Sequence, residues 1–174
     1  MSYRFACVAL LVGLVVSGCS KSSTSPTTTT TAPPKFTAVL SPASEVPAIT
    51  NADASGSGTA TITMTTFKDS AGNISVATAD FVVTLTGFPA GTAITGAHIH
   101  PGASGATGGV VVSLALAAGE ITLGNGAGSI TKGSITVTPE LAQAIINGPA
   151  GYYFNVHTTL NSGGAVRGQL VRAN

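Results

Sequence analysis

The three histidines of this 174-residue chain are the side chains best suited to chemistry, because charged residues make up only 7% of the sequence. His98 and His100 lie two residues apart in TGAHIHPG, so a β-strand there would direct both imidazoles to one side of a sheet. His157 lies far along the chain, in YYFNVHTT. Three neutral imidazoles are a known ligand set for zinc and also suit copper. If the two strands pair or face each other, these histidines would form a site for one metal ion at most.

The same histidines have a simpler interpretation, which we expect first. As half-buried hydrogen-bonding residues, they would tie the glycine-containing loops at residues 101–109 and 160–164 to the sheet. Asn155 lies on the predicted strand face of His157, and Arg167 would bridge backbone carbonyls or Glu45. This interpretation requires no metal, so copper or zinc remains the alternative cofactor.

Catalytic motifs are not evident in the sequence. No serine occupies a G-x-S-x-G motif, so acyl-transfer chemistry has no candidate nucleophile. The glycines after His100 are not followed by a lysine, and the next predicted element is a strand rather than a helix, which argues against a phosphate-binding loop. Proton transfer by the histidines is the least supported of the three interpretations, and we expect the protein not to be an enzyme. Tyr152 and Tyr153 are expected to be core and rim residues rather than a sugar-binding platform.

Composition limits the classes of partner. The chain has 7 Lys and Arg against 6 Asp and Glu, so its net charge is near zero and nucleic-acid binding is not expected. Its length allows one ordinary domain with a hydrophobic core. Both cysteines, Cys7 and Cys19, lie in the first twenty residues, which leaves the body of the chain without disulfides or thiolate metal sites.

The N-terminal region predicts export and membrane attachment. Residues 1–18 have one positive charge followed by an apolar run, as in a secretory signal peptide. The sequence VSGC at 16–19 resembles the bacterial lipobox, which implies that Cys19 becomes the lipid-modified first residue of a membrane-anchored lipoprotein. Ser20, rather than Asp, after this cysteine favours the outer membrane. The rest of 19–35 is rich in Ser, Thr and Pro and is expected to be a disordered tether.

The remaining chain, 36–174, has the pattern of an all-β domain. Apolar residues alternate with threonines in GTATITMTTF at 58–67, and a second alternating strand is expected at 74–87 after a hairpin turn. A further strand is expected at 110–116, with Val110, Val112, Leu114 and Leu116 facing one way. The closing pair is expected at 152–159 and 165–172.

One short helix is expected at 139–147, with Thr138 at its N-cap, Pro139 in its first turn and Gly148 at its end. Leu141 and Ile145 would point inward. With roughly eight short strands, the chain is expected to form an antiparallel β-sandwich, with an up-and-down barrel as the alternative.

Several motifs together resemble the CHRD domain, the module named from chordin. They are FTAVLSPASEVPAI, GAHIHPGASGATGGVVVSL and YYFNVHTTLNSGGAVRGQL, and the resemblance covers about residues 36–171. It implies an immunoglobulin-like or superoxide-dismutase-like sandwich, with no established activity for bacterial members. Gly102 and Gly168, which belong to the H-x-H-x-G and R-G-Q motifs, are expected to support the site with Asn155 and Arg167. Ala165 departs from the acidic residue that the family often has there, which would leave Arg167 less firmly held.

The likeness to copper-zinc superoxide dismutases, which also combine H-x-H with a later histidine, favours the metal alternative. Those enzymes need more histidines and an aspartate ligand, so a dinuclear site is not expected. We therefore expect first a membrane-anchored module with a binding or structural role at the cell envelope, whose partner would be an envelope protein or a small ligand. The alternative is a mononuclear copper or zinc protein, redox-active if the metal is copper. An adhesion or assembly role is a third expectation.

Overall fold

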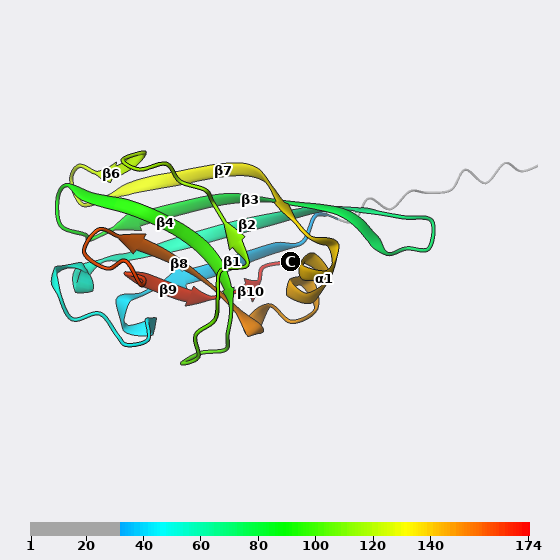
Figure 1. The fold of residues 1–174 in the computed structure, drawn as a ribbon, viewed down its shortest axis with the longest axis horizontal. Coiled ribbons are helices and arrows are strands. Elements are labelled where there is room, and N and C mark those ends of the chain that lie inside the picture. Colours follow the sequence, from blue (N-terminus) through cyan, green and yellow to red (C-terminus); the bar gives the residue numbers. More distant parts are fainter. Residues whose placement is uncertain (1–31) are drawn as a thin grey trace, which may run out of the picture. The chain divides into compact units, whose positions relative to one another are not determined.

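Two antiparallel sheets face each other in the computed structural model, which describes residues 32–174 (Figure 1). The predicted signal peptide, Cys19 and most of the predicted tether lie outside the described residues. The first sheet has the order β10-β1-β2-β3-β7, with β1 (Lys35–Leu40), β2 (Ser57–Lys68), β3 (Ile74–Thr86), β7 (Gly128–Val137) and β10 (Val171–Arg172). The second has the order β5-β4-β8-β9, with β6 also paired to β4, and consists of β4 (Thr92–Pro101), β5 (Val112–Ser113), β6 (Ile121–Leu123), β8 (Tyr152–Thr158) and β9 (Val166–Gln169).

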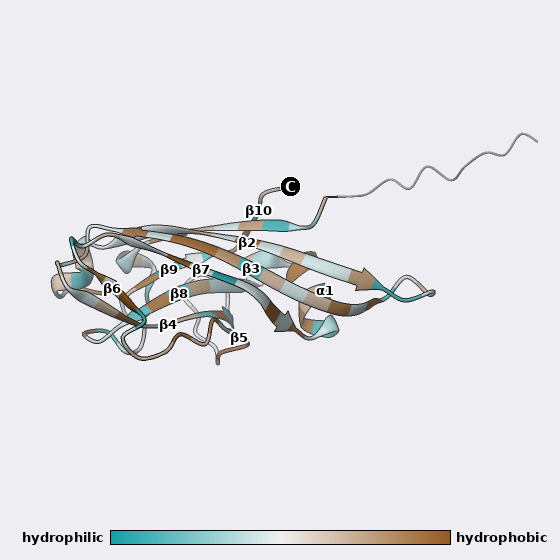
Figure 2. Ribbon diagram, turned by 90° about the horizontal axis from the view of Figure 1, so that it is seen from above, coloured by the Kyte–Doolittle hydropathy of each residue, from teal (hydrophilic) through white to brown (hydrophobic). Residues whose placement is uncertain are grey.

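The hydrophobic core lies between the two sheets, as the alternation of apolar residues predicts. Figure 2 shows both layers edge-on, with apolar segments along the strands. In β2, Ala60, Ile62 and Met64 are fully buried, and the intervening threonines are directed away from the core. Phe81 of β3 meets Phe154 of β8 across the core, with ring centroids 6.0 Å apart. The β-sandwich prediction is confirmed, including its single α-helix in the described chain.

Helix α1 (Pro139–Asn147) has the predicted bounds. Thr138 Oγ1 accepts a hydrogen bond from the Leu141 amide at 3.4 Å, and Gly148 follows the last helical residue. Ile145 is fully buried, whereas Leu141 is only partly buried. The helix packs against β3. None of the helices within residues 32–174 is long and apolar enough to cross a membrane.

The strand predicted at 110–116 is wrong in extent, because only Val112–Ser113 forms β5. Its pairing with β4 is short, and Ala115 has φ +48°, a left-handed conformation that ends an extended strand. Val112 and Leu114 are buried as predicted, but Val110 is 51% exposed.

The last predicted strand, 165–172, is divided between the two sheets. Val166–Gln169 forms β9 beside β8, and Val171–Arg172 forms β10 beside β1. Leu170, which is 1% exposed, lies at the change of sheet. The buried side chain at this position anchors the crossing between sheets, so one apolar pattern in the sequence serves two strands.

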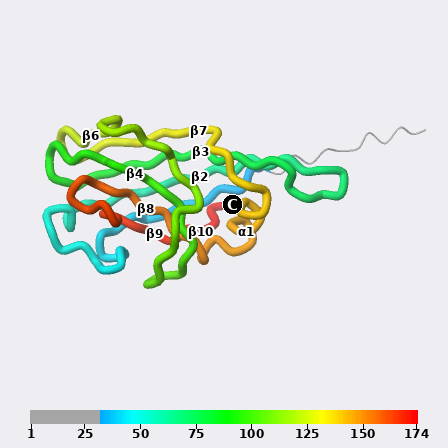
Figure 3. The backbone as a smooth tube through the Cα atoms, in the orientation of Figure 1, coloured from blue at the N-terminus to red at the C-terminus, as the bar shows by residue number. Residues whose placement is uncertain are grey.

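Loops from distant parts of the chain meet at one end of the sandwich. Two short 3-10 turns, η1 (Pro42–Ser44) and η2 (Ala52–Ser55), contact each other at this end, whereas a third, η3 (Pro149–Gly151), lies beside α1. Figure 3 shows the segment after β1 beside the loop after β8, and Asn51 Nδ2 donates to Asn161 Oδ1 across them at 2.8 Å. Buried Asp53 accepts from Thr158 Oγ1 and Asn161 Nδ2, each at 2.6 Å. These contacts hold the loops that border the histidines.

Candidate metal centre

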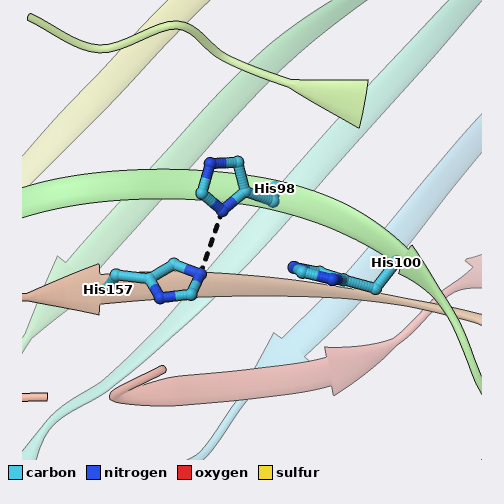
Figure 4. Close-up of side chains that lie close together, drawn as sticks. All are labelled: His98, His100 and His157. Carbon is cyan, nitrogen blue, oxygen red and sulfur yellow. Dashed lines mark hydrogen bonds between the residues drawn. The ribbon is translucent and has the colours of Figure 1, made fainter. Parts of the chain in front are cut away.

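The three histidines lie together on the outer face of the second sheet. β4 and β8 are neighbours, and their register places His98 opposite Asn155 and Gly96 opposite His157. The residues between them, such as Ile99 and Val156, belong to the hydrophobic core, so alternation along each strand directs the imidazoles to the other face. Figure 4 shows the rings of His98 and His100 from β4 and of His157 from β8 pointing toward one another.

The distances between the rings are short. One ring nitrogen from each histidine lies within 4.8 Å of the others, and His98 Nδ1 is 3.0 Å from His157 Nε2. Ligand atoms around a tetrahedral zinc ion lie about 3.3 Å apart, given Zn–N distances of about 2.0–2.1 Å. The spacing therefore needs only small side-chain adjustments to hold one ion.

Two backbone carbonyls fix how His100 and His157 are turned. His100 Nδ1 lies 2.9 Å from Gly108 O, and His157 Nδ1 lies 2.9 Å from Ser162 O. A carbonyl oxygen only accepts, so each Nδ1 carries the proton, and Nε2 of a neutral ring carries a lone pair. Both Nε2 atoms face the centre of the cluster, which is the arrangement that metal-binding histidines need.

Burial favours the neutral rings of His98 and His157. The pKa of His98 is lowered to about 4, first by burial and then by the neighbouring His157 and His100. Burial also lowers the pKa of His157, opposed by its hydrogen bond to Ser162. Both rings are therefore neutral at neutral pH, and their nitrogen lone pairs are available to a metal.

Asn155 lies at the centre of this arrangement. Its side chain is 2% exposed, and Oδ1 is 3.0 Å from Nε2 of both His100 and His157. Strand alternation predicted that Asn155 shares a face with His157, and the structure brings it into contact with the rings of both His100 and His157.

A stack of side chains supports His100. The ring of Tyr153 is parallel to it within 5°, with centroids 4.9 Å apart, and Arg167 Cζ lies 3.4 Å from the Tyr153 centroid on β8. Arg167 also donates to Ala103 O at 3.0 Å and to Gln169 Oε1 at 3.1 Å. The predicted bridge from Arg167 to a carbonyl is thus present. The expectation that Tyr153 is a core or rim residue missed its contact with His100, although strand alternation already placed it on the face of Asn155 and His157.

Glu45 is the acidic group nearest to this region. It is 8% exposed, and its Oε1 has no hydrogen-bond partner among the described residues. Burial raises the pKa of Glu45 to about 7, although the positive charge of Arg167 and the Asn155 side chain lower it. Within residues 32–174 the one ion pair is Lys132–Glu120, so the alternative of a direct Arg167–Glu45 bridge is wrong.

The two glycines expected to support the site have different surroundings. Gly102 has φ +146°, and a Cβ there would lie 3.2 Å from the Tyr153 ring, so this glycine lets the loop pass over the stack. Gly168 is instead packed between the sheets, where a Cβ would lie 2.2 Å from Val39 O. The first supports the histidine region through Tyr153, whereas the second supports the fold.

The fold and the site together define a class, namely β-sandwich proteins with a partly buried three-histidine cluster on the outer face of one sheet. The CHRD domain family matches residues 36–170, nearly all of the described chain, and the protein belongs to this family. No curated protein matches the chain.

Proposed function

We propose that this CHRD-domain protein binds one zinc or copper ion through His98, His100 and His157. The observation that carries the proposal is the direction of the ring nitrogens. His100 and His157 each use Nδ1 for a backbone carbonyl and turn Nε2 inward, toward each other's strand. Anchoring the loops requires only the Nδ1 hydrogen bonds. It does not account for the convergence of the remaining ring nitrogens, which a bound metal ion would explain.

The donor atoms narrow the choice of metal. Imidazole nitrogen suits zinc and copper, whereas calcium and magnesium prefer oxygen ligands. No cysteine lies within the described residues to add a thiolate, so the three imidazoles are the nitrogen donors on which the site depends.

Metal analysis of the full mature protein, purified in detergent without a His-tag, tests this proposal. We expect one zinc or copper ion per chain after dialysis and a higher thermal unfolding temperature with metal than with a chelator. The variant in which all three histidines are replaced by alanine should lose both effects. Sub-stoichiometric metal in the unmodified protein, with no metal-dependent stabilisation, would contradict the proposal.

We further propose that the domain acts outside the cytoplasm, held to a membrane by lipid on Cys19. The lipobox-like sequence and the Ser/Thr/Pro-rich residues before the CHRD domain support this location. Incorporation of labelled palmitate and recovery in the membrane fraction are expected for the native chain and not for Cys19→Ser. Equal recovery of the native chain and Cys19→Ser in the membrane fraction would contradict the proposed lipid anchor and would leave the proposed metal binding unaffected.

A further inference from the structure

We infer that Asn155 supplies the fourth donor to the metal through its side-chain oxygen, and that Glu45 is a positioning residue that holds the amide in the required orientation. This inference rests on the proposed metal site. It concerns how the site is completed, and its failure would leave the three-histidine proposal intact.

The first argument is a mismatch of donors and acceptors around Asn155. Its Oδ1 lies 3.0 Å from Nε2 of His100 and 3.0 Å from Nε2 of His157. In neutral rings those nitrogens carry lone pairs, because the single proton of each ring is used at Gly108 O or Ser162 O. An amide oxygen also has only lone pairs to offer.

His98 relieves only part of this mismatch. Its Nδ1 lies 3.0 Å from His157 Nε2 and, if protonated, donates one hydrogen bond to that atom. His100 Nε2 and Asn155 Oδ1 then still face each other with no proton between them. Unpaired acceptors in a buried site are costly, whereas a cation among them converts every lone pair into a ligand.

A rotated amide would remove the mismatch without a metal, because its NH2 group would donate to both rings. Glu45 opposes that rotation. A Cβ placed on Gly164 would lie 2.5 Å from Glu45 Oε1 and 2.8 Å from Asn155 Nδ2, so the carboxylate and the amide nitrogen flank the same small space. An ionised carboxylate accepts and does not donate, so in that form Glu45 favours the amide nitrogen on its own side and leaves the oxygen facing the histidines.

The backbone at Gly164 makes this approach feasible. Its φ of +132° is a conformation that residues with side chains rarely adopt, and any side chain would occupy the space between Glu45 and Asn155. The Glu45 carboxylate is itself buried, and its Oε1 has no hydrogen-bond partner among the described residues. The amide nitrogen of Asn155, which borders the same space beside Gly164, can supply the donor that this oxygen lacks.

A fourth protein donor changes what the site does. Zinc sites with four protein ligands are closed and serve binding or structure, whereas catalytic sites retain a position for water. Three imidazoles and one amide oxygen form a complete tetrahedral set. The arrangement thus points to tight retention of a metal rather than to activation of a bound water.

Zinc titration and cobalt(II) spectroscopy of the full mature protein test the inference. Cobalt(II) replaces zinc as a probe, because its visible absorption is strong in four-coordinate tetrahedral sites and weak in six-coordinate ones. Asn155→Leu, which keeps the size and removes the donor, is expected to bind zinc about 100-fold more weakly. Its cobalt spectrum is expected to differ from that of the native protein, because water would replace the amide oxygen as the fourth ligand. Glu45→Gln is expected to weaken zinc binding about tenfold, because its amide tolerates either orientation of Asn155.

Met64→Leu is the control, since Met64 is a fully buried core residue of β2, in the sheet that does not carry the histidines. It should bind zinc like the native protein. Native affinity and spectrum in Asn155→Leu would overturn the fourth donor, and native affinity in Glu45→Gln would overturn the positioning role. If Asn155→Leu does not fold, Asn155→Asp provides the test. A carboxylate oxygen at this position should retain zinc binding and the tetrahedral spectrum. A decrease in zinc affinity of more than tenfold would overturn the inference. Absence of zinc from the native protein would instead refute the three-histidine proposal.

Discussion

The outer faces of the two sheets both carry polar side chains, but these side chains are exposed to water on the first sheet and covered by loops on the second. On β2 the outward residues are mainly threonines, which remain accessible to water between the buried Ala60, Ile62 and Met64. On β4 and β8 the outward residues are also polar, but His100, Asn155 and His157 are buried. Loops over the second sheet remove water from these side chains, and His100 and His157 donate to backbone carbonyls of those loops instead.

This difference indicates that the outer face of the second sheet serves a function beyond the stability of the fold. Threonine on a solvated strand face satisfies its hydroxyl with water at little cost. Burying imidazoles, an amide, a guanidinium and a carboxylate costs free energy unless each has a partner, and Glu45 Oε1 has none among the described residues. A covered polar face with an unsatisfied member is typical of a functional site rather than of packing.

The two sheets share one hydrophobic core, so a substitution in that core is expected to have the largest effect on stability. Phe154→Ala should destabilise the protein by about 3–5 kcal/mol, because it leaves a cavity against Phe81 between the sheets. Phe67→Ala is the control, since Phe67 is 62% exposed, and it should change stability by less than about 0.5 kcal/mol. Urea unfolding followed by circular dichroism measures both. Separate unfolding transitions for the two sheets in Phe154→Ala would break the comparison.

Gly168 gives the next largest effect, because it lies where β9 approaches β1. Gly168→Ala would place a Cβ 2.2 Å from Val39 O, so we expect a loss of about 1–3 kcal/mol or more. Gly163→Ala, in the preceding loop with no atom within 4 Å of the added Cβ, should be nearly neutral. Equal urea midpoints for the two variants would show that the sheets do not depend on this close approach.

The outer faces themselves are compared by removing one polar group from each. Gln169 donates to the carbonyls of Gly102, Ala150 and Tyr152, so Gln169→Leu should cost about 1–3 kcal/mol. Thr61→Val on the solvated face of β2 should change stability by less than about 0.5 kcal/mol. Thermal and urea unfolding of the two variants should therefore differ clearly, and similar values would remove the distinction between the faces.

The smallest expected effect is a pH dependence of the metal-free protein. The pKa of His98 is lowered to about 4 and that of His157 is also lowered, so both rings bind protons more readily in the unfolded chain. Their contribution to stability is complete above the ordinary histidine pKa of about 6.5 and is lost as the pH falls toward the folded values. Glu45 acts oppositely: with its pKa raised from 4.5 to about 7, its contribution is complete below 4.5 and is lost as the pH rises toward 7.

Glu45→Gln removes the opposing contribution. Its unfolding temperature, measured with a chelator present, should therefore fall more steeply than that of the native protein between about pH 7 and pH 4.5. The first sheet contributes no comparable buried titratable group to this range, so the effect belongs to the covered face. Parallel curves for the two proteins would show that Glu45 is not held in its buried environment.

Local patterns in the sequence were sufficient for much of the fold. Alternation in β2 and β3 predicted which side chains are buried, and Thr138 and Gly148 predicted the ends of α1, because these signals act within a few residues. The short β5 was not predicted, since the left-handed backbone at Ala115 has no glycine to signal it. The change of sheet at Leu170 was also missed, because a continuous apolar pattern does not show which partner strand each half will meet.

The residues of the candidate site could be predicted from the sequence, but the orientations of their side chains could not. Spacing placed His98 and His100 on one face, and the pairing of β4 with β8 brought His157 to them. The tautomers of His100 and His157 depend on hydrogen bonds to Gly108 O and Ser162 O. Every residue has a backbone carbonyl, so the sequence does not show which carbonyl a histidine will meet. The place of Glu45 beside Asn155 depends on loops that meet only after the sheets have formed.

The position of β1 has a mechanical consequence. β1 lies between β10 and β2, and the backbone at Lys35 is held from the C-terminal side, because Lys35 N donates to Asn174 Oδ1 at 2.7 Å and Lys35 O accepts from the Ala173 amide at 2.8 Å. A pull on Lys35 directed along the strand axis would load the hydrogen bonds on both sides of β1 together, as shear. Such bonds must break in concert, whereas bonds at a peeled edge break one at a time. Tension along β1 at its N-terminal end would therefore be resisted by two neighbouring strands at once.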